Sequence, residues 1–393
     1  MLSITGILLI LLLCWGLSKD KKSINWQTIL SGLLIQAGLA FFILKTTIGR
    51  NFFSFLSRCI TALIDMAAKG GRFAFGPLYD SPDFIFAFKI APAIIFISSL
   101  VSVLYFIGVM HPILKYSSWL LHKVMKVSGA EALANIASAF VGQVESALPL
   151  KPYFGKLTQS QFFAIMVGGM STISAALLAT YASMGIPSQY LLAANLMGIP
   201  AGLIIAKLLW PSENSENNQV LPEPETPKAA NVMDAAVHGA QEGLKISLGV
   251  ISMVIAFLSI IGLLDLFLDI FNTSLSQILG LVLSPFTVLM GVPPEESQLV
   301  GSLIGQKVAL NEFVAFLDLL NKTNICPISQ RSLMIASFAI CGFANFGSIA
   351  IQLGAFSQML PERRSEFAEM GVMAMFAGAL ASCLSACWAN LFF

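Results

Sequence analysis

Long apolar runs constrain the fold of this 393-residue chain more than any other feature of its sequence. Eight such runs lie near residues 2–18, 27–46, 84–109, 160–184, 187–209, 246–271, 331–357 and 370–393. Several exceed the roughly 20 residues that an α-helix needs to cross the hydrocarbon core of a bilayer. Only 11% of the residues are charged, against roughly 25% in a soluble globular domain. The pattern therefore predicts an all-α integral membrane protein with about eight transmembrane helices.

Composition and charge exclude several classes of partner and activity. The net charge is +1 and no basic stripe is present that would bind a phosphate backbone, so we expect no nucleic-acid partner. The sequence has no phosphate-binding loop and no nucleophile–base arrangement, so we expect neither direct ATP drive nor enzyme activity. Cys383 and Cys387 share a helix face without a His or carboxylate to join them. We therefore expect no structural metal and no cofactor.

The first apolar run is expected to be a membrane helix rather than a signal peptide. It lacks a basic stretch before it and a small-residue cleavage pattern after it. The basic residues of 19–22 follow it directly, as at the cytoplasmic end of a span. An even number of spans would bring both termini to the same side of the membrane.

A hydrophilic segment divides the chain into two halves of comparable length. Residues 211–228 are rich in Pro, Glu, Asn and Ser and lack apolar periodicity, which is typical of a flexible linker. The amphipathic stretch that follows, 231–245, predicts an interfacial helix on the membrane surface.

Each half contains a segment that is too polar for a plain span and too apolar for a loop. The first lies near 130–154 and the second near 284–320, and both are interrupted by Gly, Pro and acidic residues. Irregular backbone at membrane depth is tolerated only where it is buried in protein or lines a cavity. Both segments are therefore predicted to be re-entrant helical hairpins.

The two halves also share an order of elements that suggests an inverted repeat. A polar hinge and a helix rich in small residues follow each broken segment, at 158–161 in the first half and at 329–332 in the second. Residues 169–172 then align with 342–345. Paired interrupted segments in the two halves of a transporter point to its substrate site.

Five polar side chains lie in apolar surroundings within or beside these segments. They are Gln143, Glu145, Asn311, Glu312 and Asn345. An acidic group deep in a bilayer costs ~2.5–3.5 kcal/mol, so the two carboxylates are expected to face a ligand, water or one another. Interhelical hydrogen bonding is the alternative, and for Asn311 it stays open. Carboxylates and carboxamides near an aromatic ring suit a neutral, hydroxyl-rich molecule with a flat ring.

Five strings spread over nearly the whole chain resemble the concentrative nucleoside transporter family, in the form of its bacterial members. They are FIFAF at 84–88, VGQVE at 141–145, YASMG at 181–185, GQK and NEFVA within 305–315, and CGFANFGSI at 341–349. The resemblance implies a homotrimer in the bacterial cytoplasmic (inner) membrane. Each subunit would have a scaffold domain and a transport domain that slides across the membrane like an elevator.

The resemblance also implies a division of the chain into domains. Residues 1–110 would form N-terminal scaffold spans with an interfacial helix, and 111–209 the first half of the transport domain. The linker would occupy 210–230, and an interfacial helix with a scaffold span 231–280. Residues 281–393 would form the second half of the transport domain, with the second hairpin and the last two spans.

By the same resemblance, the substrate site would combine the two hairpins with two partly unwound helices. Gln143 and Glu145 would bind the nucleobase, in a pocket shaped by Val144 and Leu177. The ribose hydroxyls would be bound by Glu312, Asn345 and Ser348, while Phe343 would border the base. Many relatives have a polar residue at the position of Val144, which leaves the preference for purines or pyrimidines open.

A coupling-cation site is implied at four further positions. The family's sodium-coupled bacterial pattern has Asn at the position of Ser138 and Ser at that of Thr172, with backbone carbonyls from Val141 and Ile173. A strong oxygen ligand is therefore missing here, and proton-coupled relatives are similar at Ser138. We favour H⁺ over Na⁺ as the coupling cation, carried by a carboxylate such as Glu312 or Glu145.

The expected function is secondary active import of nucleosides by cation symport. The alternative is a facilitative carrier, or a symporter for another small polar solute, with the same fold. Accumulation of the solute above equilibrium distinguishes the symporter from the facilitative carrier.

Overall fold

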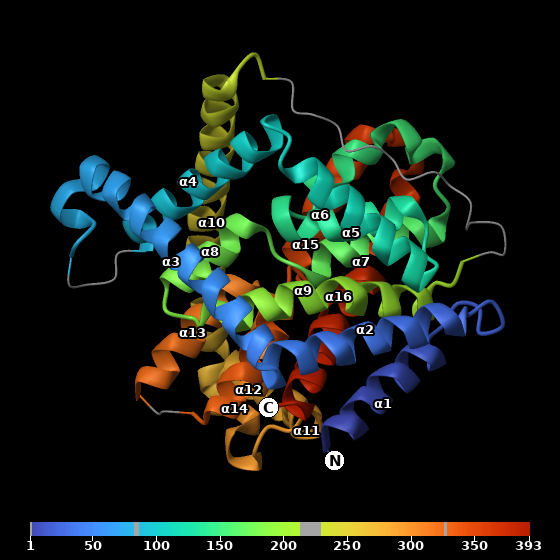
Figure 1. Ribbon diagram of the computed structural model, residues 1–393. Coiled ribbons are helices and arrows are strands. Elements are labelled where there is room, and N and C mark those ends of the chain that lie inside the picture. Colours follow the sequence, from blue (N-terminus) through green and yellow to red (C-terminus); the bar gives the residue numbers. More distant parts are fainter. Residues whose placement is uncertain (1, 82–85, 213–228, 326–327) are drawn as a thin grey trace.

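The computed structural model describes residues 2–81, 86–212, 229–325 and 328–393, and within these ranges its regular structure is helical (Figure 1). Most of the predicted linker, 213–228, lies outside the described residues. The α-helices are α1 (Leu2–Gly16), α2 (Trp26–Lys45), α3 (Thr47–Phe75), α4 (Phe86–Phe106), α5 (Met110–Met125), α6 (Gly129–Val141), α7 (Gln159–Ser171), α8 (Ala175–Ser183), α9 (Ser188–Leu209), α10 (Val232–Leu268), α11 (Leu275–Met290), α12 (Pro294–Ala309), α13 (Glu312–Ile325), α14 (Gln330–Ile340), α15 (Phe346–Met359) and α16 (Arg364–Leu391).

Six helical segments in the described part of the chain are long and apolar enough to cross a membrane, or seven if the bent pair α11–α12 counts as one. Six of the eight predicted spans correspond to these six segments. The first predicted span is a helix of only 15 residues, α1. The span predicted at 331–357 is divided into α14 and α15 by non-helical residues 341–345. The chain is therefore the all-α membrane protein that was predicted, with its first span shorter and the spans at 160–184 and 331–357 interrupted.

The helix α10 differs from the prediction of a separate interfacial helix at 231–245. It runs unbroken for 37 residues and joins that stretch to the span predicted at 246–271. Its small residues allow a close approach to α4, since a Cβ on Gly239 would lie 2.6 Å from the Ser98 carbonyl oxygen. The amphipathic pattern thus reflects packing against α4, and the prediction of a separate helix was wrong.

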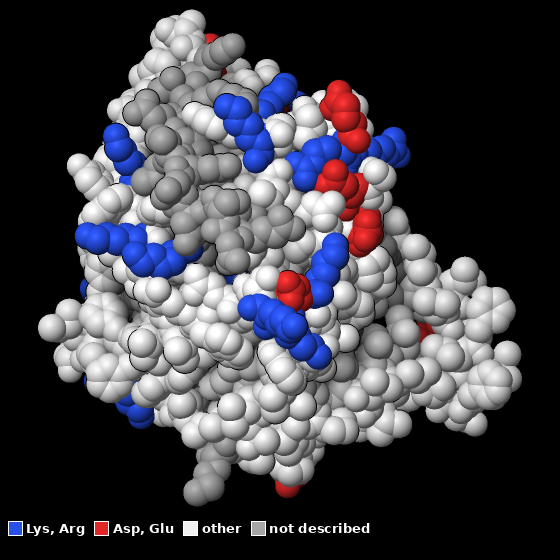
Figure 2. Space-filling model, turned by 90° about the vertical axis from the view of Figure 1, so that its right-hand side faces the viewer, with Lys and Arg blue, Asp and Glu red and all other residues white. Residues whose placement is uncertain are grey.

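The most buried helices form the centre of the molecule. The segments α7–α8 and α9 are almost wholly buried, and α16 runs beside α9 through the middle of the fold (Figure 1). By contrast, most of α10 is exposed, with Ile255 and Leu266 among many uncovered apolar side chains. Figure 2 shows a face on which most charged side chains gather in the upper part, above a broad area with few of them. The uncovered apolar side chains of α10 are of the kind that a bilayer or a neighbouring subunit would cover.

The two ends of the chain lie on the same side of the molecule. Asn390 in α16 donates hydrogen bonds to the Ser3 hydroxyl in α1 (2.6 Å) and to the Met290 carbonyl in α11 (3.1 Å). The expectation that both termini lie on the same side of the membrane stays a prediction.

Close packing of α9 against the end of α7 leads to the first prediction. The Ser171 hydroxyl donates to the Gly198 carbonyl (3.1 Å), and a Cβ on Gly198 would lie 2.4 Å from the Ser171 carbonyl oxygen. Backbone must shift to accept a side chain there, so Gly198→Ala should destabilise the protein by about 1–3 kcal/mol. Thermal unfolding in detergent should show a lower Tm.

The matched control is Gly249→Ala in α10, where a Cβ would meet nothing within 4 Å. Removing a helical glycine at an open position stabilises slightly, so its Tm should stay the same or rise. Equal melting temperatures for the two variants would contradict the packing described here.

Candidate binding site

Two hairpins interrupt the bundle at the positions that the sequence predicts. In the first, α6 ends at Gly142 and the chain returns as a 3-10 segment, Glu145–Lys156, which contacts α6. Gly142 has φ +115°, a conformation that favours glycine. In the second hairpin, α12 is followed by two non-helical residues, Leu310 and Asn311, and α13 returns against it.

Two broken helices follow the hairpins. The break between α7 and α8 spans residues 172–174, and that between α14 and α15 spans 341–345. Each second piece begins with a side-chain cap: the Ser174 hydroxyl accepts from the Leu177 N–H (3.4 Å), and the Asn345 side chain accepts from the Ser348 N–H (2.8 Å). Both pieces therefore direct a capped helix N-terminus toward the break.

The caps establish how the two halves correspond. Thr158 caps α7 and Ser329 caps α14. In each half the next cap, Ser174 or Asn345, comes sixteen positions later in the sequence. The sequence alignment of 169–172 with 342–345 is thus displaced by two residues. The sequence alignment paired two glycines that differ in their surroundings. Gly169 packs against Gln143, whereas Gly342 lies in the break with φ +133°.

The two breaks lie against each other. A Cβ on Gly342 would be 3.0 Å from the Met170 carbonyl oxygen and 2.9 Å from the Ser382 hydroxyl in α16. Gly378 in α16 likewise approaches Met170 and Ala344. Unpaired backbone groups of both broken helices are therefore brought together in the interior, where irregular backbone can be satisfied.

Glu312 is the carboxylate at the centre of this region. It is 5% exposed, and each of its oxygens accepts a hydrogen bond, Oε1 from the Tyr181 hydroxyl (2.9 Å) and Oε2 from the Asn345 amide (3.1 Å). These donors hold a negatively charged acceptor in place, as burial of a carboxylate requires. Tyr181 was not assigned a role from the sequence. A buried tyrosine hydroxyl needs a partner, and that requirement was the available signal.

Gln143 joins the first hairpin to the second broken helix. Its amide donates to the Ser348 hydroxyl (3.2 Å), and its oxygen accepts from the Gln352 amide (3.3 Å). Gln352 also donates to the Met166 carbonyl (3.1 Å) and is fully buried. Gln352 was not predicted from the sequence, although a glutamine within an apolar run is an evident candidate.

The other predicted substrate residues differ in exposure. Leu177 and Phe343 are each 8% exposed. Val144 is half-buried, whereas Glu145 is exposed at the tip of the first hairpin. Hydrogen bonds thus unite Gln143 with Ser348, and Glu312 with Asn345, while Glu145 lies at the accessible end of the hairpin.

The predicted cation residues also come together. The Ser138 and Thr172 hydroxyls lie 2.8 Å apart, and both bond to the Gly168 carbonyl, at 3.3 and 3.0 Å. Ile173 is buried in the break and its N–H donates to Asn195 (2.8 Å), while Val141 ends α6. Neutral oxygens are suitable ligands for a hard cation. These oxygens also hydrogen-bond to one another within the buried cluster.

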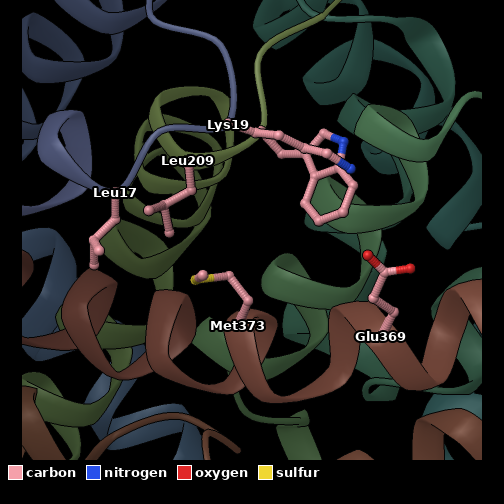
Figure 3. Close-up of a pocket in the computed structure, with 6 residues that line it drawn as sticks. Leu17, Lys19, Leu209, Glu369 and Met373 are labelled. Carbon is pink, nitrogen blue, oxygen red and sulfur yellow. The ribbon is translucent and has the colours of Figure 1, made fainter.

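A surface pocket lies elsewhere, at the end of α9 (Figure 3). It is lined by Leu17, Lys19, Leu209, Trp210, Glu369 and Met373. The Lys19 ammonium stacks over the Trp210 ring at 3.6 Å from its centroid. No predicted substrate or cation residue is among these lining residues, so the pocket is separate from the site between the hairpins.

Comparisons with known proteins cover the whole chain. Family models match 5–78 (Na+ dependent nucleoside transporter N-terminus), 87–188 (Gate, nucleoside recognition) and 190–390 (Na+ dependent nucleoside transporter C-terminus). The chain is 41% identical to the uncharacterized transporter YutK of Bacillus subtilis, over 98% of both chains. It is 33% identical to the nucleoside permease NupC of Helicobacter pylori, over 99% of this chain and 97% of that one. The structure of CNTnw in an inward-facing, substrate-bound state matches with 37% identity and a TM-score of 0.94, over 100% and 98% of the two chains.

The hydrogen bonds from Tyr181 and Asn345 to Glu312 lead to a prediction on stability. Tyr181→Phe removes one of the two donors to a buried carboxylate, which should cost about 1.5–3 kcal/mol. The melting temperature in detergent should fall. Tyr116→Phe, at a position 70% exposed, is the control and should leave it unchanged. An unaltered Tm for Tyr181→Phe would show that this hydrogen bond does not stabilise the fold.

Proposed function

The chain belongs to the concentrative nucleoside transporter family, and on this premise we propose that it imports nucleosides by symport with a cation. It is an integral protein of the bacterial inner membrane that transports nucleosides by alternating access, and it is not an enzyme. CNTnw has been captured in inward-facing, outward-facing and intermediate states. The coupling cation, the roles of single residues and the assembly belong to the proposal.

The observation that carries the substrate assignment is the buried carboxylate between two breaks in the bundle. Vicinal ribose hydroxyls are hydrogen-bond donors, and an ionised carboxylate binds them by charge-assisted bonds about twice as strong as neutral ones. We assign this role to Glu312, with Asn345 and Ser348. Tyr181 and Asn345 orient the carboxylate before substrate arrives, which reduces the ordering cost of binding.

The base is assigned to the first hairpin. Gln143 offers both a donor and an acceptor, as the edge of a uracil or adenine requires. Its hydrogen bond to Ser348 bridges the two halves, so a nucleoside that enters between them exchanges this bond for contacts on both sides. Glu145 approaches from the accessible hairpin tip, while Val144, Leu177 and Phe343 supply apolar and aromatic walls.

We favour the proton as coupling cation. The Asn side-chain oxygen of the family's sodium-coupled bacterial pattern is missing at Ser138, which removes a strong ligand for sodium. Glu145 and Glu312 are the proposed proton carriers. The descriptions of the matching family models name Na+, which makes sodium the alternative.

An elevator motion within a homotrimer completes the proposal. The scaffold would consist of 1–110 and 231–280, and the transport domain of 111–209 and 281–393. The helices α4 and α10 pack closely against each other at the edge of the fold (Figure 1). The uncovered apolar side chains of α10 are the surface that neighbouring subunits and lipid would cover.

A symporter for another small polar solute is the second candidate. The observation that favours it is Val144, an apolar side chain at a hairpin tip whose neighbours are Gln143 and Glu145. A facilitative carrier of the same fold differs from both in reaching equilibrium without accumulation.

Uptake into proteoliposomes tests function and coupling together. An inward proton gradient should accumulate uridine or adenosine above equilibrium, and a sodium gradient alone should not. Ser138→Asn, which supplies the missing carbonyl oxygen, should introduce a response to sodium. Accumulation driven by sodium in the unaltered protein would refute proton coupling, whereas equilibration without accumulation would favour a facilitative carrier.

Substitution of Glu312 tests the ribose assignment. Glu312→Gln should lower uridine uptake at least about tenfold and reduce the preference for uridine over 2′,3′-dideoxyuridine, because the charge-assisted acceptor is lost. Glu369→Gln, at an exposed position of the separate surface pocket, should behave like the unaltered protein. Uptake of both nucleosides reduced in equal proportion would place Glu312 outside ribose recognition.

A further inference from the structure

Lys307 is a buried cation for which the transport mechanism above has no use. It lies in α12, close to the tip of the second hairpin, and its side chain has no exposed surface. Its ammonium donates to the Ala339 carbonyl and to the Ser382 hydroxyl, both at 2.9 Å. Lysine is almost never fully buried unless its charge is balanced, because desolvating an ammonium is expensive.

The ligands of this ammonium resemble those of an alkali cation. Ala339 is in the last turn of α14, where carbonyls lose their intrahelical partners and the helix dipole is negative. The Ser382 hydroxyl also bonds to the Cys341 carbonyl in the break (2.8 Å). Both groups that hold Lys307 are neutral oxygens.

The internal repeat relates the Ala339 carbonyl, which accepts from Lys307, to a carbonyl in the first half. Ala339 lies ten residues after Ser329, the cap of α14, and Gly168 lies ten residues after Thr158, the cap of α7. The Gly168 carbonyl is therefore the counterpart of the Ala339 carbonyl. In the first half it accepts from Ser138, on the first helix of the first hairpin. In the second half its counterpart accepts from Lys307, on the first helix of the second hairpin.

We propose that Lys307 is a tethered cation that permanently fills the second half's counterpart of the coupling-cation site. The inference rests on the sodium alternative of the proposed function, because it takes the Ser138–Thr172–Gly168 cluster as the place where an alkali cation would bind. Only the first half can then exchange an alkali cation during transport. The tethered ammonium holds the second hairpin to α14 and α16 in every state of the cycle. Lys307 is thus a positioning residue.

Two variants of the full chain in proteoliposomes separate charge from packing. Lys307→Met retains the volume without the charge, and it should keep a cooperative thermal transition yet lose uridine uptake at least about tenfold. Lys307→Ala opens a space beside the Ala339 carbonyl and Ser382. Propylammonium, which replaces the missing part of the side chain, should restore uptake in a saturable manner, and propanol should not.

The outcomes are distinguishable. The proposal of a tethered cation would be overturned if Lys307→Met accumulated uridine like the unaltered protein. It would also be overturned if propanol restored uptake by Lys307→Ala as well as propylammonium does. Lys322 lies in the same hairpin and forms a partly exposed ion pair with Asp318. Lys322→Ala is the control for any effect of propylammonium on uptake that does not depend on the Lys307 site. Its uptake should be normal and indifferent to propylammonium, and equal stimulation there would also count against the proposal. Failure of the unaltered protein to accumulate nucleosides would instead refute the proposed function.

Discussion

The satisfaction of backbone polar groups inside a bilayer is the constraint on which this structure depends. A helix can be interrupted at membrane depth only where other protein groups take over its hydrogen bonds. Two hairpin tips and two helix breaks therefore gather in one interior region, where capping side chains such as Ser174 and Asn345 satisfy the exposed N–H groups. The same groups that make the interruptions tolerable also make the region polar, and a polar interior region is where a hydrophilic solute can bind.

The two halves use one architecture for unlike chemistry. In the first half the end of the broken helix meets two hydroxyls, those of Ser138 and Thr172, and the site is neutral. In the second half the corresponding carbonyl accepts a hydrogen bond from Lys307, and Glu312 follows five residues later in the same hairpin. The second half thus has a lysine where the first half has a hydroxyl. On the proposal made above, this asymmetry leaves only the first half able to bind an alkali cation.

Much of the candidate site followed from single residues read against their surroundings. Glu312 was identified because a carboxylate within an apolar segment is costly, and the structure shows it held by two donors. The hairpins were predicted because Gly and Pro interrupted segments that were otherwise apolar. The interfacial helix at 231–245 was predicted wrongly, because an amphipathic stripe that packs on α4 has the same period as one that faces lipid headgroups. Tyr181 was missed because a tyrosine is not unusual in a span until its burial is known, whereas Gln352 was overlooked although its apolar surroundings are visible in the sequence.

The sequence by itself determined that this is an all-α membrane protein of a transporter family, where its interruptions lie, and which polar residues need an explanation. These properties depend on local composition, on hydropathy over about 20 residues and on short motifs. Only the tertiary structure decided which residues meet: Gln143 with Ser348, Glu312 with Tyr181, and Lys307 with the end of α14. The register of the repeat was likewise decided by helix caps and not by matched glycines. Hydrogen bonds between residues distant in the chain depend on how helices pack, and one sequence does not encode that packing in any local pattern.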